Sequence, residues 1–479
     1  MAGKKKEDAL TIEDRLKAAL VPEDEQPYPI PENWVWTKMG TVTDINMGQS
    51  PAGIYTNTDS NGLPLVGGPT DMGDVYPTTG RYTSKPAKSC RDGDIIISVR
   101  ATIGKLNIAD REYCLGRGVA GIRGNGINQN FIKRYLQTCT QSLVERGTGT
   151  TFLQVSKRDI STLTFPLPPL PEQQRIAKHL ESLLGKIKEA KALLDEVPEI
   201  LQNFRQTVLA SACSGRLTAD WRREKFTMVS TPEEVGHHLG MVPADEQPYP
   251  VPEKWVWTRL DRAFNEVKDK TIPTQETNLS FIGLEHLKSG GGIIGIGNSK
   301  DVKSTKTVFN TGDVLYGKLR PYLNKHALVN FSGVASTDIL VFRSKGILDP
   351  RLLDNYLGLL HVVAYAQSNS KGINLPRVSP QVIKSLPVPL PPLPEQHEIV
   401  RRVESLFNKS DNLEAQYKEA MGLIETLPEI ILSKAFRGEL VPQDPGDEPA
   451  SVLLENIVAT RGISENNSTN KIRKKVGII

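Results

Sequence analysis

Two identical stretches of seven residues, Leu167-Pro-Pro-Leu-Pro-Glu-Gln173 and Leu390-Pro-Pro-Leu-Pro-Glu-Gln396, decide the fold of this 479-residue chain. Each is followed by a long run in which apolar residues recur at alternating spacings of four and three. The two runs stay 223 positions apart as far as Gly215 and Gly438. This spacing is the a/d seam of a coiled coil, whose narrow apolar stripe needs one partner helix. Because the chain carries two such helices, we predict an intramolecular coiled coil.

The predicted seam runs without a gap through both helices. Ser410 departs from an ideal zipper and marks either a loosened layer or a contact for a partner. Pro198 and Pro428 interrupt the helical pattern, so we expect a kink or a local break at each. The seam residues of the first helix are Ile176, Leu180, Leu183, Ile187, Ala190, Leu194, Val197, Leu201, Phe204 and Val208. Those of the second helix are Ile399, Val403, Leu406, Ser410, Leu413, Tyr417, Ala420, Ile424, Leu427 and Ile431.

A second repeated phrase opens each half of the chain. Pro22-Glu-Asp-Glu-Gln-Pro-Tyr-Pro-Ile-Pro-Glu-Asn-Trp-Val-Trp36 returns almost unchanged as Pro243-Ala-Asp-Glu-Gln-Pro-Tyr-Pro-Val-Pro-Glu-Lys-Trp-Val-Trp257. Its prolines exclude a helix and favour an extended entry. The two tryptophans of each copy are two residues apart, so they face the same side of a strand. We predict that they hold the first strand of each half in its core.

Between this phrase and the coil helix, each half holds roughly 130 residues with little helical periodicity. Short β-rich runs alternate there with glycine, asparagine, aspartate and proline, as in 93–100 and 312–320. We predict a mixed, mainly β domain in each half, with short helices near Asn130–Arg146 and Arg351–Ser368. The two halves share their ends much better than their middles, which indicates one scaffold that presents two different recognition surfaces.

The composition, with 38% hydrophobic and 24% charged residues, is compatible with a soluble globular protein of two to four domains. No apolar run is long enough to span a bilayer, and no apolar segment follows the basic start Met1–Lys6. The four cysteines are far apart and lack a C-x-x-C spacing. This pattern argues against a zinc site or a disulfide framework and favours the cytoplasm.

Basic residues are concentrated in the two middles. The net charge is +4 over 40–165 and +7 over 262–386. This suits an anionic partner such as a phosphate backbone, although a solvated surface gives the same pattern. Arginine can pair with the edge of a guanine, while lysine and backbone amides hold phosphates. The candidate nucleic-acid contacts, all at ends of predicted strands, are Arg100, Lys105, Arg117, Arg123, Lys318, Arg320, Lys325 and Arg343.

Motifs for catalysis are missing from the sequence. The stretch Gly116–Gly121 matches G-x-G-x-x-G but does not lie between a strand and a helix, and Gly290–Gly297 lacks the lysine and hydroxyl of a P-loop. No Asn-Pro-Pro-Tyr/Phe motif of a methyltransferase that acts on a flipped base is present. The histidines show no metal-ligand spacing. We therefore predict a binding protein with no catalytic residue and no metal site.

The two β-rich middles, each followed by Leu-Pro-Pro-Leu-Pro-Glu-Gln and a long helix, resemble the specificity (S) subunit of a type I restriction-modification enzyme. Further family-like phrases are 205–218 and 431–440. The resemblance covers nearly the whole chain except its tails. It implies two target recognition domains, each reading one half of a split DNA sequence, and an antiparallel coiled coil that spaces them. The fold class is then α+β, with two pseudo-symmetric, strand-rich domains joined by a two-helix coil.

On this interpretation the chain divides into seven segments. They are an N-terminal tail (1–21), recognition domain 1 (22–165), coil helix 1 (166–215), a linker (216–242), recognition domain 2 (243–386), coil helix 2 (387–438) and a C-terminal tail (439–479). The seam from Ile176 to Val208 is roughly 50 Å long at 1.5 Å per residue. That length can hold two domains about one DNA turn apart, since adjacent major-groove sites lie roughly 34–36 Å apart.

The resemblance also implies the partners. Double-stranded DNA and two methylation (M) subunits would bind this chain, restriction (R) subunits would complete the assembly, and no membrane is involved. S-adenosylmethionine, ATP and Mg²⁺ would be held by the partner subunits and not by this chain. Two other functions are considered: a coiled-coil adaptor that does not bind DNA, and a standalone enzyme with an unrecognised site. A duplex-binding assay excludes the first if binding depends on sequence, and a purified chain without activity excludes the second.

Overall fold

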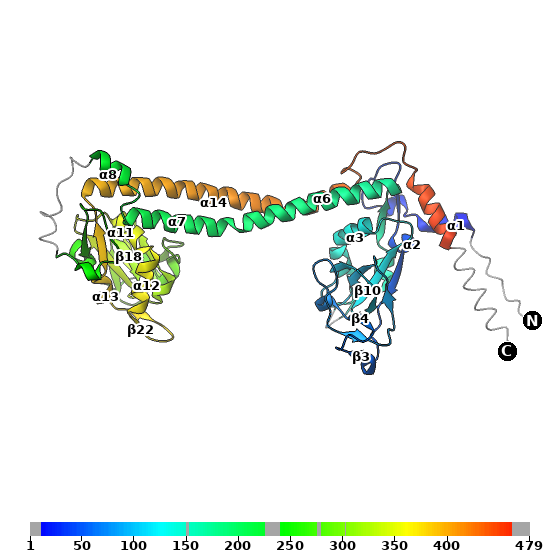
Figure 1. Cartoon of the computed structure of the whole chain (residues 1–479), viewed down its shortest axis with the longest axis horizontal. Coiled ribbons are helices and arrows are strands. Elements are labelled where there is room, and N and C mark those ends of the chain that lie inside the picture. Colours follow the sequence, from blue (N-terminus) through cyan, green and yellow to red (C-terminus); the bar gives the residue numbers. More distant parts are fainter. Residues whose placement is uncertain (1–10, 150–152, 226–239, 275–278, 302, 462–479) are drawn as a thin grey trace, which may run out of the picture. The chain divides into compact units, whose positions relative to one another are not determined.

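The computed structural model describes residues 11–149, 153–225, 240–274, 279–301 and 303–461. The chain divides into two compact units. Unit 1 is Met1–Ala192 with Met421–Ile479, and unit 2 is Leu193–Ala420. Each unit contains one strand-rich domain and one part of a helical pair (Figure 1).

Unit 1 contains two main sheets. An antiparallel sheet has the order β2-β10-β7-β8, and a second sheet has the order β3-β5-β4-β9-β6, with β4 and β9 parallel. Its strands are β1 (Val35–Lys38), β2 (Thr43–Met47), β3 (Thr56–Asn57), β4 (Leu63–Val66), β5 (Tyr82–Thr83), β6 (Ser89–Cys90), β7 (Ile95–Ser98), β8 (Leu106–Ile108), β9 (Tyr113–Leu115), β10 (Val119–Gly124) and β11 (Thr164–Leu167). Its helices include α1 (Ile12–Ala19), η1 (Glu23–Glu25), α2 (Met39–Val42), η2 (Gly53–Tyr55), η3 (Pro69–Asp71), α3 (Gln129–Thr138), α4 (Thr140–Arg146), α5 (Lys157–Ser161) and most of α6 (Leu170–Asp195).

Unit 2 repeats this arrangement. Its antiparallel sheet has the order β13-β21-β18-β19, and its second sheet has the order β14-β17-β20-β15-β16, with β15 and β20 parallel. Its strands are β12 (Val256–Arg259), β13 (Phe264–Glu266), β14 (Lys270–Thr271), β15 (Ser280–Ile282), β16 (Gly297–Asn298), β17 (Lys306–Phe309), β18 (Val314–Gly317), β19 (His326–Leu328), β20 (Gly333–Ala335), β21 (Ile339–Ser344), β22 (Ser370–Lys371), β23 (Arg377–Val378) and β24 (Pro387–Leu390). Its helices include α7 (Val197–Cys213), α8 (Ala219–Lys225), η5 (Ala244–Glu246), α10 (Leu260–Ala263), η6 (Leu284–His286), η7 (Ser299–Asp301), η8 (Pro321–Leu323), α11 (Pro350–Leu357), α12 (Leu360–Ser368), α13 (Pro380–Lys384) and most of α14 (Leu393–Phe436).

One inner strand of each antiparallel sheet, β7 in unit 1 and β18 in unit 2, is buried on both faces, as its apolar sequence requires. We call it the central strand. All four residues of β7 and all four of β18 are buried. The helices expected over Asn130–Arg146 and Arg351–Ser368 are each two short helices, α3 with α4 and α11 with α12. Asn128 and Asp349 cap the first helix of each pair by accepting a backbone N–H.

The repeated tryptophans are buried, as predicted, with 2–4% of their surface exposed. Each lies on or just before the first strand, β1 or β12, which pairs with the strand that leads into the coil helix, β11 or β24. The indole Nε1–H of Trp34 donates to Glu172 over 2.9 Å, and that of Trp255 donates to Glu395 over 2.8 Å. Both acceptors are the glutamate of the Leu-Pro-Pro-Leu-Pro-Glu-Gln motif.

The glutamine of the motif makes a second link between the helix start and the domain. In unit 1, Gln173 accepts from the backbone N–H of Asn128 over 3.0 Å and donates to Pro168. In unit 2, Gln396 accepts from the N–H of Asp349 over 2.8 Å and donates to Ile347 and Pro391. The Glu–Gln pair therefore fastens each coil helix to the first strand and to the first capped helix of its domain.

A third segment of the chain donates further hydrogen bonds to each buried glutamate. In unit 2, Glu395 also accepts from Thr218 over 2.7 Å and from Arg222. In unit 1, Glu172 accepts from Gln443 over 2.6 Å. Burial raises the pKa of Glu172 above its usual value, against the hydrogen bonds from Trp34 and Gln443 that lower it. The expected linker in unit 2 and the expected C-terminal tail in unit 1 thus each supply hydrogen-bond donors to the buried glutamate.

Both expected tails contain packed residues. Helix α1 has a capping box at Thr11 and buries Ala19. Residues 450–461 are helical, and Leu454 and Ile457 lie in the same core as the sheet of unit 1. Residues 1–10 and 462–479 lie outside the described residues.

The two coil helices are antiparallel, and ion pairs between them or next to them lie in both units. In unit 1, Lys191 lies 4.0 Å from Glu425. In unit 2, Arg205 pairs with Asp411 at 2.5 Å and with Glu414 at 3.4 Å. Further along the chain in unit 2, Asp220 of α8, the short helix after α7, pairs with Arg402 of α14 at 2.7 Å. Residue numbers therefore rise along one helix as they fall along the other.

The prolines act differently in the two helices. The first helical run breaks at Glu196, between α6 and α7, and Pro198 occupies the first turn of α7. A proline is tolerated there because the first turn has no intrahelical N–H bond to lose. Pro428 lies inside the uninterrupted helix α14. The expected kink or local break is confirmed as a break at Pro198, and α14 has no break at Pro428.

Most predicted seam positions are buried or half-buried. The buried ones are Ile176, Leu180, Leu201, Val208, Ile399, Val403 and Ser410, and the half-buried ones are Leu183, Ile187, Ala190, Leu194, Val197, Leu406, Tyr417, Ala420, Ile424 and Ile431. Leu413 is 54% exposed, so its predicted place in the seam is wrong. Next to Leu413 the contact between the two helices is polar, because Arg205 binds Glu414 and lies over the ring of Phe407. Phe204 and Leu427 are also exposed, and the buried Ser410 hydroxyl has no partner among the described residues.

Candidate nucleic-acid interface

In unit 2, three loops meet at one end of the antiparallel sheet. We name residues 318–320, 336–338 and 376–378 the loop junction of unit 2. The backbone N–H of Lys318 donates to Asp338, and that of Val378 donates to Lys318. The N–H of Arg320 donates to Pro376 over 2.8 Å, and Arg377 lies 3.4 Å from the Asp338 carboxylate. Lys318 and Arg320, two predicted contacts, therefore lie beside one another at this junction.

The same junction is present in unit 1, over residues 99–101, 116–118 and 153–155. The N–H of Val99 donates to Gly118, and that of Val155 donates to Val99, each over 2.9 Å. Arg100 forms an isolated β-bridge with Gln154. The Arg100 Nε is buried and has no hydrogen-bond partner among the residues that the structure describes. The backbone of the junction is thus repeated, while its side chains differ between the units.

Each junction contains a residue in the left-handed region. Ala101 has a φ of 61° and Arg320 a φ of 52°, and each is the third residue after the central strand of its sheet. Such a conformation costs of order 1–3 kcal/mol for a residue other than glycine. In unit 2 the residue in this conformation is the exposed Arg320, which directly precedes η8 and its first residue, Pro321. Residues with strained backbones cluster at active sites and ligand-binding sites, so this strain is consistent with a binding role for the junction.

Two predicted contacts, Lys105 and Lys325, are instead used inside their domains. They occupy equivalent positions at the start of β8 and β19. The Lys105 ammonium donates to the carbonyl oxygens of Pro69 and Met72, and that of Lys325 donates to Leu284 over 2.5 Å. Each lysine therefore ties the loop after the central strand to the 3-10 segment that follows β4 or β15.

Arg123 and Arg343 lie at the other end of the sheet from the loop junction. Arg123 Nε is 2.5 Å from Asp94, and Arg343 makes a bidentate pair with Asp313 at 2.9 and 2.8 Å. The hydrogen bonds that Arg343 donates to the Asp313 carboxylate raise the pKa of its guanidinium. These arginines satisfy aspartates that lie almost buried in the turn before the central strand, so the structure does not bring them together with the other candidates.

Arg117 lies at the rim of a hollow of about 380 Å³ in unit 1. The hollow is also lined by Ser50, Gly67, Thr70 and Arg81, and Arg81 pairs with Asp71 at 2.6 Å. The G-x-G stretch 116–118 has a packing role here, since a Cβ on Gly118 would lie 2.3 Å from the Gly67 carbonyl oxygen. Close backbone contact thus presents the exposed Arg117 side chain at the junction.

Lys371 and Arg377 are basic residues of the junction region that the sequence analysis missed. They face one another across the two-residue strands β22 and β23. Strands this short leave no alternating pattern, so the only local signal is the turn sequence Gly372–Pro376. The corresponding turn of unit 1 includes residues 150–152, which lie outside the described residues.

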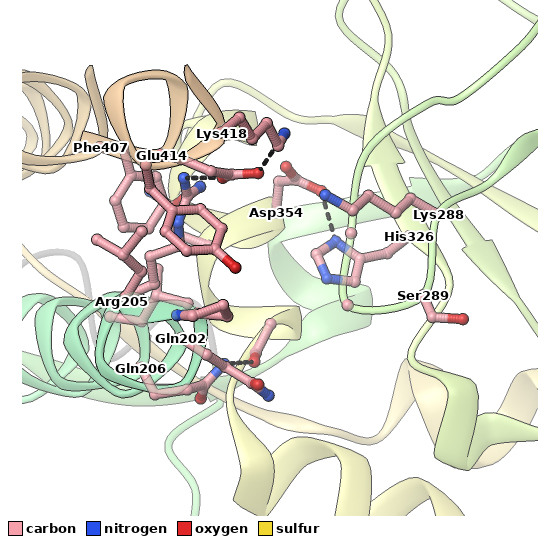
Figure 2. Close-up of a pocket in the computed structure, with 18 residues that line it drawn as sticks. Gln202, Arg205, Gln206, Lys288, Ser289, His326, Asp354, Phe407, Glu414 and Lys418 are labelled. Atoms are coloured by element: carbon pink, nitrogen blue, oxygen red, sulfur yellow. Dashed lines mark hydrogen bonds and ion pairs between the residues drawn. The ribbon is translucent and has the colours of Figure 1, made fainter. Parts of the chain in front are cut away.

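A larger hollow in unit 2, of about 660 Å³, is lined by residues of α7, α14 and the domain (Figure 2). His326 Nδ1 lies 2.7 Å from Asp354, and the buried Nε2 has no partner among the described residues. The pair is reminiscent of a catalytic dyad, which needs a nucleophile. Ser289 is the serine among the lining residues, and Figure 2 shows its side chain turned away from the imidazole. The His326–Asp354 pair therefore has no serine nucleophile among the described residues that line this hollow.

Within the described ranges, no cluster of three or more His, Cys, Asp or Glu side chains is arranged to hold a metal ion. In the same part of the chain, no helix is long and apolar enough to cross a bilayer.

Comparisons with known proteins give a consistent result. The family model described as type I restriction modification DNA specificity domain matches twice, at residues 31–199 and 253–421. The specificity subunit of the type I restriction enzyme EcoDI from Escherichia coli is 32% identical over 394 residues, covering 79% of this chain and 85% of that protein. The EcoBI specificity subunit from the same species is 26% identical and covers 92% of this chain and 95% of its own length.

Solved structures share the fold. A chain from a structure of type I R-M complex assembly and conformational transition aligns with a TM-score of 0.63 at 20% identity, covering 86% of this chain and all of that one. The HsdS subunit from Thermoanaerobacter tengcongensis aligns with a TM-score of 0.58 at 20% identity, over 87% of this chain and all of that one.

The different environments of Arg343 and Arg117 predict different effects of their removal. Arg343→Met should lower the free energy of unfolding by about 1–3 kcal/mol, because the buried Asp313 loses its partner. Arg117→Met should change it by less than about 0.5 kcal/mol, because Arg117 is exposed. Urea denaturation of both variants measures this difference. An unchanged midpoint for Arg343→Met would show that the ion pair does not support the sheet.

Proposed function

Because the chain belongs to the family of type I restriction-modification DNA specificity subunits, we propose that each recognition domain reads its half of a bipartite DNA site through its loop junction. The chain is the sequence-specific, non-catalytic recognition component of the complex. The supporting observation is the repeated junction itself, in which one backbone arrangement carries different side chains. Gly116-Arg117-Gly118 in unit 1 corresponds to Ser336-Thr337-Asp338 in unit 2. Side chains that differ on a shared frame are what two different half-sites require.

The predicted contacts then divide by role. Arg100, Arg117, Lys318 and Arg320 are the candidates that lie at a junction and face DNA bases or phosphates. Lys105 and Lys325 position the loops, and Arg123 and Arg343 stabilise the sheets. This assignment follows from the bonds that each cation already makes, since a cation bound to carbonyls or a carboxylate has fewer donors left for phosphate.

The antiparallel coil sets the distance between the half-sites and binds two M subunits. Two pairs of exposed apolar side chains lie one residue before seam positions: Leu193 and Ile200 in unit 2, and Leu423 and Ile430 in unit 1, with exposures of 70, 59, 60 and 49%. Members of each pair are seven residues apart. Leu423 and Ile430 form a stripe along one face of α14, while Leu193 and Ile200 lie on either side of the break at Glu196. Ile200 and Leu423 are equivalent positions of the sequence repeat. An exposed apolar residue at one repeated position of each coil helix suits two copies of one partner.

R subunits join through this assembly, and the partners hold S-adenosylmethionine, ATP and Mg²⁺. The site of action is the cytoplasm, where chromosomal and entering DNA is found. The four cysteines are free and buried, which suits a reducing compartment.

Selection of bound duplexes from a random library by the complex of this chain with M subunits tests the function. We expect two constant blocks of bases separated by a spacer of fixed length. A single continuous block, or enrichment of no sequence, would contradict bipartite recognition.

A lysine at this repeated position should weaken the binding of one M subunit. Ile200→Lys and Leu423→Lys are each expected to raise the Kd of one of the two M sites by about tenfold or more, since a charge replaces buried apolar contact. Glu199→Lys adds the same side chain on the helix face away from the seam and serves as the control. Titration followed by native mass spectrometry gives the stoichiometry. Equal binding by Ile200→Lys and the control would show that M subunits bind elsewhere.

A further inference from the structure

We propose that the β22–β23 hairpin of unit 2 inserts its apolar tip between base pairs and kinks the DNA at its half-site. This inference rests on the proposed function. The tip, Gly372–Pro376, contains Ile373, which is 100% exposed, and Leu375, which is 52% exposed. Exposed aliphatic side chains on a protruding element act as wedges that unstack a base step and bend the duplex.

The hairpin is held firmly at its base. Its two strands pair Lys371 with Arg377 and Ser370 with Val378. The returning strand is bonded to the loop junction through the N–H of Arg320 on Pro376 and the N–H of Val378 on Lys318. A wedge needs such support, because the force that separates stacked bases is transmitted to the frame that carries it. The tip therefore projects from the site already assigned to DNA.

The charges beside the tip indicate an anionic partner. Lys371 and Arg377 lie directly opposite one another, and like charges in that position destabilise a β-ribbon. Arg377 is partly compensated by Asp338 at 3.4 Å, whereas Lys371 has no acidic partner among the described residues. A phosphate on each side of the inserted tip would remove the repulsion. The exposed Arg320 adds a third cation at the same place.

A protein partner is the other class of occupant for an exposed apolar tip. Cations flank this tip and the hairpin is bonded to the loop junction, which favours the nucleic acid. In Figure 1 the β22 hairpin lies at the end of its domain remote from α7 and α14, where the M subunits are proposed to bind. We therefore assign the tip to duplex DNA.

DNA bending by the complex with M subunits tests the wedge. The probe is a set of circularly permuted duplexes that carry the selected bipartite site, analysed by gel mobility. The wild-type complex should bend the DNA with one bend centre in or beside the half-site of domain 2. The double variant Ile373→Ser, Leu375→Ser should reduce the bend by about 20° or more and bind about tenfold more weakly. Met241→Ser, which removes a 62% exposed apolar side chain from the entry segment of unit 2, should behave as wild type.

Each other outcome is decisive. An equal bend for the double variant and the wild type would overturn the wedge while leaving site recognition intact. Loss of M binding by the double variant in the absence of DNA would assign the tip to a protein partner and would also overturn it. Failure of the wild-type complex to select any bipartite site would instead remove the proposed function on which the inference rests.

Discussion

A buried carboxylate at the start of each coil helix is the interaction on which the structure depends. Glu172 and Glu395 each accept an indole N–H from the first tryptophan of their domain, and each also binds a residue from a distant segment. An ionised carboxylate leaves water at a high cost unless its lone pairs are satisfied. The chain can therefore bury these groups only when strand, helix and returning segment are all in place, and this requirement fixes each domain on its helix.

This constraint explains why the repeated phrases are conserved between the halves of the chain while the middles differ. The tryptophan phrase and the Leu-Pro-Pro-Leu-Pro-Glu-Gln motif supply the two sides of the same contact. The middles need only return their strands to this frame, so their loops are free to carry different side chains. The side chains of Arg117 and its counterpart Thr337 can thus differ without disturbing the attachment of either domain. A protein with two independent half-sites needs a constant scaffold and a surface whose side chains can change without affecting that scaffold.

The sequence predicted the features that depend on a repeated local pattern. Heptad spacing located the coil helices, and the tryptophan phrase located the first strand of each domain. The partners of Glu172 and Glu395 could not be predicted, because Gln443 and Thr218 lie far from the motif and in segments without a pattern. Leu413 followed the heptad spacing, yet Arg205 makes a polar contact at that level that spacing alone does not reveal.

For the predicted basic contacts as well, the sequence reveals some features and not others. Arg123 lies near the end of β10, whereas Arg100, Lys105 and Arg117 lie in the loops next to strand ends. Which end of the sheet each occupies, and whether a carboxylate or carbonyl already binds it, depends on strand order and on contacts between distant loops. The hairpin at Lys371 was missed because its strands are two residues long and carry no period.

Glu395→Ala tests most directly whether the buried glutamate fixes its recognition domain on the coil helix. Trp255, Thr218 and Arg222 would lose their acceptor, so the unfolding free energy of unit 2 should fall by about 3–5 kcal/mol. The complex should then lose selection of the half-site read by domain 2 and retain that of domain 1. Glu404→Ala, which removes a 55% exposed partner of Arg351, should cost less than about 1 kcal/mol and change neither half-site. Equal stability and equal site selection in the two variants would contradict the account.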